Sequence, residues 1–324
     1  MNRRKVIALL GSAVLAWPFA AHAQQPRVWR VGMLETIAPE LNTANLSAFR
    51  RGLQELGYVE GRNYVLEYRS ADGRAERFPS LAAELVRAQV DLIVTRGTPA
   101  AHAARDATSK IPIVMAAVGE ALGVVESLAR PGGNVTGLSA FTTELAGKRV
   151  EFAKELLPGL ARVGLLHNMS NPVAQPQWEQ TKTAARQLAI EAELLDVRSA
   201  DDVGRAIDAA ADKRIGALLV GTDGVTQENR SLIAELAARN RVPAIYAAKE
   251  FIESGGLISY AGSFQELYFR AARFVDRILK GAKPGDLPVE QPTKFEIVIN
   301  LKAARAIGLS IPDSFLARAD EVIE

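Results

Sequence analysis

Three short stretches of this sequence occur twice, in the same order and at similar spacing. The paired stretches are RVGML at 30–34 and RVGLL at 162–166, RSAD at 69–72 and 198–201, and IPIVMAA at 111–117 and VPAIYAA at 242–248. The first two begin 39 positions apart in one copy and 36 in the other, and the last two 42 and 44. One such match can arise by chance, but three in the same order indicate two copies of one structural unit.

Each copy alternates short apolar stretches with amphipathic ones. In the first copy the predicted strands are 28–35, 64–72, 91–97 and 111–117, and helices are expected between them. This alternation is typical of a parallel sheet covered by helices on both faces. Two copies therefore predict an α/β protein of two Rossmann-like lobes with parallel sheets.

Two further parts of the chain must connect these copies. RPGGNVTGLSAF at 130–141 lies between them, with a strong turn at Pro131-Gly132-Gly133. After the second copy come a strand at 257–262, a long amphipathic helix that ends by Gly281, and the segment LPVEQPTKFEIVIN at 287–300. The prolines of this last segment suit an extended connector, and its alternating end predicts a strand at a sheet edge.

The N-terminus has the pattern of a secretory signal. Residues 1–23 contain a basic start, an apolar run, and Ala21-His22-Ala23 as a cleavage site. A membrane anchor is the alternative, but the apolar run is short for a span and contains Pro18. The Arg3-Arg4 pair leaves both the Sec and the twin-arginine routes open.

Composition narrows the class of protein. Without residues 1–23 the chain keeps 301 residues, enough for about two domains, with 36 basic against 37 acidic side chains. This near-neutral balance does not favour a nucleic-acid partner. The chain has no cysteine, which excludes disulfides, thiol nucleophiles and cysteine metal sites.

No catalytic motif stands out. The sequence has no nucleophile elbow, no phosphate-binding loop and no dinucleotide fingerprint. Of its three histidines, His22 lies in the signal, His102 in a predicted helix, and His167 at a strand end, where a polar residue at the edge of a cleft is expected. We therefore expect neither an enzyme nor a metal site nor a cofactor.

Three segments carry a family resemblance: RPGGNVTGLS in the connector, residues 219–262, and the C-terminal 283–324. They resemble the ABC transporter substrate-binding protein family that includes tryptophan-binding proteins of the TrpX type, over about 28–324. The resemblance implies the type I periplasmic-binding-protein fold, with a three-segment hinge between the lobes. The implied N-terminal lobe is 28–138 plus 263–294, and the C-terminal lobe is 139–261 plus 295–324.

The same resemblance and the predicted strand ends suggest ligand contacts in the first lobe. Gly97 and Thr98 match a family turn, and Thr98 with the N–H groups that open the next helix would hold a carboxylate. The structural alternative is that Thr98 only caps that helix, with Pro99 in its first turn. Thr36 lies in a loop after the first strand of the same lobe.

In the second lobe Asp223, Asn168 and Tyr246 follow or end strands. Asp223 would pair with a ligand ammonium, or else be a solvated aspartate in an Asp-Gly turn. Asn168 matches a family asparagine, and Tyr246 would stack on a ligand or pack the lobe. The family usually has Asp-Pro where this chain has Glu120-Ala121, so the expected ligand class transfers less safely than the fold.

The resemblance implies a periplasmic component of an ABC import system. Such a protein captures a small molecule, here an amino acid or related compound, and delivers it to permease subunits in the inner membrane. We expect a monomer. Two alternatives remain open: a secreted α/β enzyme, which needs a catalytic constellation at the strand ends, and a ligand sensor without a transport role, which needs an output domain.

Overall fold

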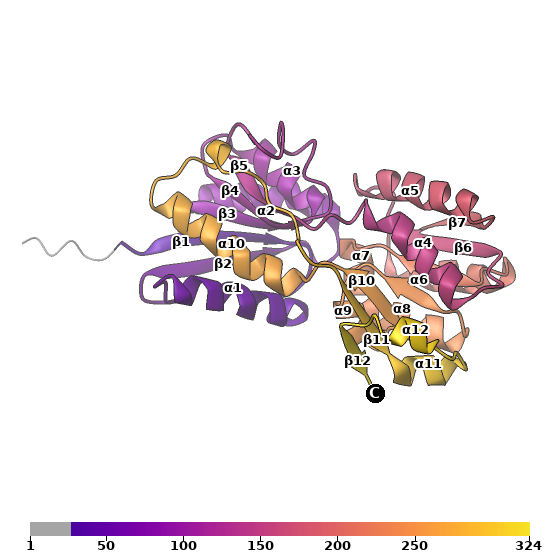
Figure 1. The fold of residues 1–324 in the computed structure, drawn as a ribbon. Helices are drawn as coiled ribbons and strands as arrows, with labels where there is room; N and C mark the ends of the chain where they lie inside the picture. The colour runs from indigo at the N-terminus through magenta and orange to yellow at the C-terminus, as the bar shows by residue number, and fades with distance from the viewer. Residues whose placement is uncertain (1–26) are drawn as a thin grey trace, which may run out of the picture.

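Two sheets form the centres of two lobes in the computed structural model, which describes residues 27–324 (Figure 1). The first sheet has the order β2-β1-β3-β4-β5 and is parallel throughout. Its strands are β1 (Trp29–Glu35), β2 (Tyr64–Ser70), β3 (Leu92–Arg96), β4 (Ile113–Val118) and β5 (Val135–Ser139). Strands β3 to β5 are buried along their whole length, as expected for strands covered by helices on both faces.

The second sheet repeats this order and then extends it. Its order is β12-β11-β10-β9-β8-β6-β7, so that β7, β6, β8, β9 and β10 correspond to the five strands of the first lobe. The bounds are β6 (Arg162–His167), β7 (Glu191–Asp196), β8 (Ala217–Val220), β9 (Ala244–Tyr246), β10 (Ile258–Ala261), β11 (Glu296–Asn300) and β12 (Glu321–Ile323). Only the β10–β11 pair is antiparallel. The predicted duplication and the two-lobed α/β fold are confirmed, whereas the terminal strand β12 was not anticipated.

Four helices cover the first sheet, and one of them follows β10 of the second sheet in the sequence. They are α1 (Thr43–Glu55), α2 (Phe78–Arg87), α3 (Thr98–Ala107) and α10 (Phe264–Leu279). Helix α10 runs alongside α1 in Figure 1. Their close approach depends on Gly52, where a Cβ would lie 2.5 Å from the Phe269 carbonyl oxygen. Glycine at this position therefore lets α10 pack against the first lobe.

The second lobe carries the remaining α-helices of residues 27–324. They are α4 (Leu145–Leu156), α5 (Ala174–Gln187), α6 (Ala200–Asp212), α7 (Gly224–Glu228), α8 (Arg230–Arg239), α9 (Glu250–Glu253), α11 (Leu301–Ile307) and α12 (Asp313–Leu316). Phe152 of α4 makes edge contacts with Tyr260 and Phe315, at centroid distances of 4.9 and 5.4 Å. These aromatic contacts join α4, β10 and α12 in one core.

Three segments of chain connect the lobes. The first leads from β5 to α4, the second passes from β10 through Gly262 to α10, and the third follows the 3-10 turn Pro284–Asp286. Within the third, Glu290 accepts a hydrogen bond from the Ser139 backbone at the edge of β5, after which β11 joins the second sheet. A Cβ on Gly262 would lie 2.9 Å from Cγ of Pro292, so the second and third segments are in contact.

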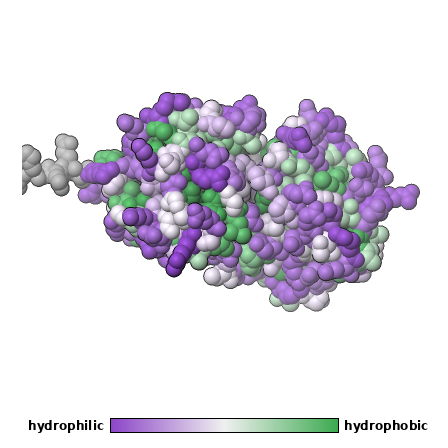
Figure 2. Space-filling model, turned by 90° about the horizontal axis from the view of Figure 1, so that it is seen from above, coloured by the Kyte–Doolittle hydropathy of each residue, from purple (hydrophilic) through white to green (hydrophobic). Residues whose placement is uncertain are grey.

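The face of the molecule seen from above is mainly hydrophilic over both lobes (Figure 2). Figure 2 shows polar residues over most of the upper face, with apolar residues in smaller patches. None of the helices within 27–324 has the length and apolar character that a membrane span requires. The predicted signal, residues 1–23, lies outside the described residues.

Candidate ligand-binding site

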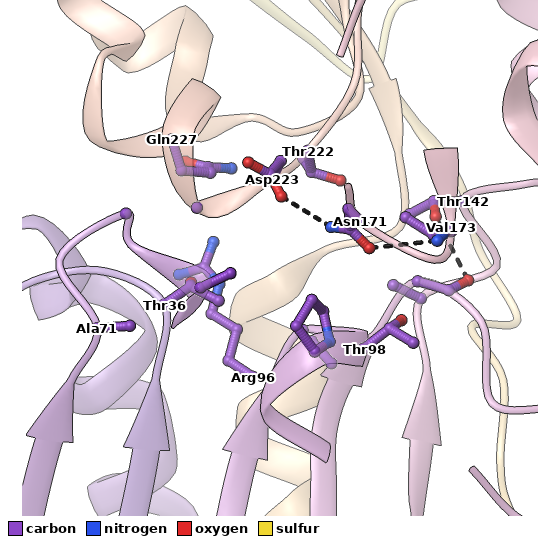
Figure 3. Close-up of a pocket in the computed structure, with 18 of the residues that line it drawn as sticks. Thr36, Ala71, Arg96, Thr98, Thr142, Asn171, Val173, Thr222, Asp223 and Gln227 are labelled. Atoms are coloured by element: carbon purple, nitrogen blue, oxygen red, sulfur yellow. Dashed lines mark hydrogen bonds between the residues drawn. The ribbon is translucent and has the colours of Figure 1, made fainter. Parts of the chain in front are cut away.

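A cavity that is partly open to solvent lies between the lobes where the carboxyl ends of both sheets meet (Figure 3). This position is where open parallel sheets bind ligands. Small and apolar side chains form much of the wall, including Phe78, Val173 and Phe264. Polar groups come from both lobes: Thr36, Arg96 and Thr98 from the first, and Asn171, Asp223 and Gln227 from the second.

Gly97 and Thr98 place the start of α3 at the cavity. Gly97 precedes the helix with φ +84°, a conformation that favours glycine, and a Cβ there would lie 2.9 Å from Cγ2 of Thr36. The Thr98 hydroxyl makes no capping bond and lies 3.3 Å from the Glu120 backbone nitrogen, which donates to it. The capping alternative for Thr98 is therefore wrong. The first N–H groups of α3 have no acceptor within the helix, so they are available to an anion.

Arg96 brings a buried positive charge to the same wall. Its Nη1 donates to Asn42 Oδ1 at 2.9 Å and its Nη2 to Glu250 Oε1 at 3.2 Å. The guanidinium also lies 5.0 Å from the ring centroid of Phe264. Asn42 belongs to the first lobe and Glu250 to α9 of the second, so Arg96 connects the two lobes beside the cavity. Burial alone would lower the pKa of Arg96, but the nearby Tyr268, Glu250 and Glu35 together hold this pKa above its usual value.

Glu35 adds a second carboxyl to this buried network. It is fully buried at the end of β1, and Oε1 accepts a hydrogen bond from the Tyr268 hydroxyl at 2.6 Å. Burial raises the pKa of Glu35 to about 7, although Arg96 and the Tyr268 hydrogen bond oppose the rise. Near neutral pH this carboxyl is therefore partly protonated.

Asp223 presents a buried carboxylate from the opposite lobe. Oδ1 accepts hydrogen bonds from the Val225 backbone at 2.8 Å and from Asn168 Nδ2 at 3.2 Å, and Oδ2 accepts from Asn171 Nδ2 at 2.8 Å. Asp223 is only 7% exposed, so the alternative of a solvated turn residue is wrong. It also caps α7. Within residues 27–324 all of these donors are neutral, and the carboxylate remains able to pair with a cation from a ligand.

Gln227 adds an uncommitted amide to the cavity wall. It is 2% exposed, and neither its Nε2 nor its Oε1 has a hydrogen-bond partner among the described residues. Buried amides normally pair both groups, so Gln227 is suited to bond a ligand. Figure 3 shows it on the same side of the cavity as Asp223, facing Thr36 and Arg96.

Some of the predicted ligand-binding residues line the cavity and others do not. Thr36, Gly97, Thr98 and Asp223 all line the cavity. Asn168 does not line it and instead orients Asp223 from behind. The sequence analysis did not predict three residues of the cavity wall, Arg96, Asn171 and Gln227. For Arg96 a signal was present, since it is a charged residue at the end of the apolar run LIVTR.

Two residues at strand ends point into the second lobe rather than into the cavity. Tyr246 is 1% exposed and stacks on Phe251 at a centroid distance of 4.9 Å. The packing alternative considered for Tyr246 therefore describes its environment. His167 was expected at the cleft edge but is fully buried against Gly221, and burial lowers its pKa.

The loop after β4 also borders the site. Thr98 Oγ1 lies within hydrogen-bond distance of both the backbone oxygen of Glu120, to which it can donate, and the backbone nitrogen of Glu120, from which it can accept. The Glu120 carboxylate accepts a hydrogen bond from the Leu122 backbone at 3.0 Å. The Glu120-Ala121 pair thus supports the α3 start from outside. Across residues 27–324 no cluster of three or more acidic, histidine or cysteine side chains has the arrangement of a metal site.

Comparison with known proteins finds relatives that match most of this chain. A curated tyrosine-binding protein of Clostridioides difficile is 29% identical over 273 residues, 84% of this chain and 78% of that protein. A crystal structure of a conserved domain protein from Vibrio cholerae shares 29% identity with a TM-score of 0.85, covering 91% of this chain and 99% of the other. The ABC domain from Streptococcus pneumoniae, solved in complex with L-Trp, shares 29% identity with a TM-score of 0.82, covering 90% and 100%.

One of these relatives is named for binding tyrosine and another was solved with L-Trp, and the fold of the two solved structures agrees with the type I periplasmic-binding-protein architecture expected here. The model of one family, ABC transporter substrate binding protein, matches residues 31–323. This match spans both lobes and all three connecting segments. The chain therefore belongs to the ABC transporter substrate-binding protein family.

Proposed function

We propose that this protein binds an amino acid with an aromatic or similarly apolar side chain and delivers it to an ABC permease. The observation that carries the proposal is the pair of opposite polar ends in one cavity. Asp223 offers a carboxylate without a cationic partner in the described chain, and the start of α3 offers free N–H groups. An amino acid has a complementary ammonium and carboxylate.

The rest of the cavity suits an apolar side chain. Phe78 and Phe264 contribute aromatic walls, and Ala71, Ala117 and Ala140 leave room beside them. A curated relative is a tyrosine-binding protein and another relative was solved with L-Trp, which supports the aromatic class for this chain. Gln227 would then bond a polar atom of the ligand.

The cellular role follows from the family and the predicted signal. The exported protein would work in the periplasm as a monomer, without cofactor, metal or catalytic activity, and dock on permease subunits of the inner membrane. The lobes 28–138 plus 263–294 and 139–261 plus 295–324 would close on the ligand as rigid bodies about the three connecting segments.

Thermal melting of the mature protein against a ligand panel tests this proposal. The panel includes tryptophan, tyrosine, phenylalanine, leucine, their des-amino acids, and sugars. An amino acid at about 100 times its dissociation constant should add about 2.7 kcal/mol of stability, while the matching des-amino acid should add much less. Stabilisation by a sugar and by none of the amino acids would refute the proposed ligand class.

A further inference from the structure

A second, smaller cavity lies inside the second lobe, behind the ligand site. It is narrow, with room for one small group, and its lining residues come from α4, α5, β6 and β8 and from Gly221 after β8. Arg149 of α4 and Thr181 of α5 contribute polar groups, while Leu165 and Leu219 contribute apolar walls. All of its lining residues are buried.

Arg149 is a buried cation without a counterion. Its side chain is held by carbonyl groups only: Nε donates to the Tyr260 oxygen at 3.0 Å and Nη1 to the Thr142 oxygen at 3.4 Å. Its Nη2 has no partner among residues 27–324, and no described carboxylate is paired with it. Arg96, the comparable buried arginine, has Glu250. Burial lowers the pKa of Arg149 to about 10, which still leaves it charged at neutral pH.

Thr181 supplies a second uncommitted donor to the same cavity. It is fully buried, and its Oγ1 has no hydrogen-bond partner in the described part of the chain. Buried hydroxyl groups normally pair, and buried charges normally have a charged partner. One small anion that accepts from Arg149 Nη2 and Thr181 Oγ1 would satisfy both groups and neutralise the guanidinium.

We propose that this cavity is a binding site for a small monovalent anion of the halide class, held by Arg149 and Thr181. The two leucines offer nothing to solvate a second negative charge, so a divalent anion such as sulfate does not fit the site. The occupant also supports the ligand cavity from behind. Arg149 donates to the Thr142 carbonyl, Gln177 donates to the Thr142 hydroxyl at 2.9 Å, and Thr142 lines the ligand cavity.

Two measurements on the mature protein test the anion site. Crystals grown in bromide should show an anomalous peak between Arg149 Nη2 and Thr181 Oγ1. Melting in chloride against gluconate at equal ionic strength should show a saturable increase of Tm with chloride. A cavity that contains only water in bromide crystals, together with equal Tm in both salts, would overturn the proposal.

Paired threonine variants separate this site from general salt effects. Thr181→Val removes one donor at nearly constant volume. It should raise the chloride concentration that gives half of the Tm increase at least about tenfold, because one hydrogen bond to a charged group is lost. Thr95→Val is the control, because Thr95 is equally buried and its Oγ1 is also unpartnered, but it lies on β3 of the other lobe. Unchanged chloride dependence in Thr181→Val would count against the site. Arg149→Met should abolish the dependence if that variant folds.

Discussion

Arg96 Nη2 and Glu250 Oε1 lie 3.2 Å apart, although the two residues belong to different lobes. Both side chains are largely buried, and Asn45 Nδ2 donates to the same glutamate oxygen at 3.0 Å. Since Arg96 also lines the ligand cavity, the ion pair and the cavity are neighbours at the interface between the lobes. The pair must separate whenever the lobes move apart there, so lobe closure and the burial of these charges are coupled.

We expect Glu250→Gln to weaken ligand binding at least about tenfold. Removing one partner of a buried ion pair costs about 3–5 kcal/mol, and the amide of glutamine recovers part of this by accepting the same hydrogen bonds. The substitution destabilises the closed form more than the open form, because water can solvate Arg96 when the lobes separate. Calorimetric titration with the ligand found in the melting screen measures the change. Glu253→Gln on the same helix is exposed and should bind as the wild type does; equal affinities for both variants would contradict the coupling.

Asp223→Asn should remove the preference for an amino group in the ligand. Asparagine can keep the cap of α7, but its Nδ2 cannot accept the hydrogen bond that Asp223 Oδ2 accepts from Asn171, so the unliganded protein should lose about 1–3 kcal/mol of stability and affinities are compared on the folded variant. The charged hydrogen bond to a ligand ammonium is worth about 1.5–3 kcal/mol, and the variant should lose amino-acid affinity by at least about tenfold.

The matching des-amino acid provides the internal comparison for Asp223. Its affinity should stay equal or increase in Asp223→Asn, because no ammonium is involved. Asp208→Asn, an exposed change on α6, is the matched control and should alter neither affinity. An amino-acid affinity unchanged by Asp223→Asn would remove this carboxylate from the binding site.

The repeated stretches were enough to predict the lobes because each strand and helix is marked by local apolar spacing. The order of β7, β6, β8, β9 and β10 in the second sheet then follows from the order of the first sheet, whereas β11 and β12 have no counterpart there. The Arg96–Glu250 pair was not predictable, since its members are 154 positions apart and neither position has a distinguishing local pattern. His167 and Tyr246 show a second limit: both end strands, but whether the last side chain faces the cleft or the core depends on a shift of one residue.

Gly97→Ala should damage the ligand site more than backbone strain alone explains. Alanine at φ +84° is strained, and its Cβ would also meet Thr36 Cγ2 at 2.9 Å. Gly57→Ala is the control for strain, because Gly57 has φ +90° but no atom within 4 Å of the added Cβ. Each change should cost about 1 kcal/mol or more in unfolding free energy, measured by urea titration. Only Gly97→Ala should also weaken ligand binding, and equal affinities would show that the Thr36 contact is unimportant.

Glu35→Gln should remove a dependence of stability on pH. The folded protein holds the Glu35 pKa at about 7 against an ordinary 4.5, so between these values the native state binds more protons than the unfolded chain. The contribution of Glu35 to stability is therefore greatest below about pH 4.5, falls by at most about 1.4 kcal/mol per pH unit as pH rises to 7, and is constant above that.

Glutamine cannot ionise, and its oxygen can still accept the Tyr268 hydrogen bond. The unfolding free energy of Glu35→Gln relative to wild type should therefore rise from pH 5 to 7 and level off at pH 8, as measured by urea titration at each pH. Glu55→Gln, an exposed change at the end of α1, should give a curve parallel to that of the wild type. A parallel curve for Glu35→Gln as well would mean that Glu35 titrates normally in the folded protein, and that burial does not raise its pKa.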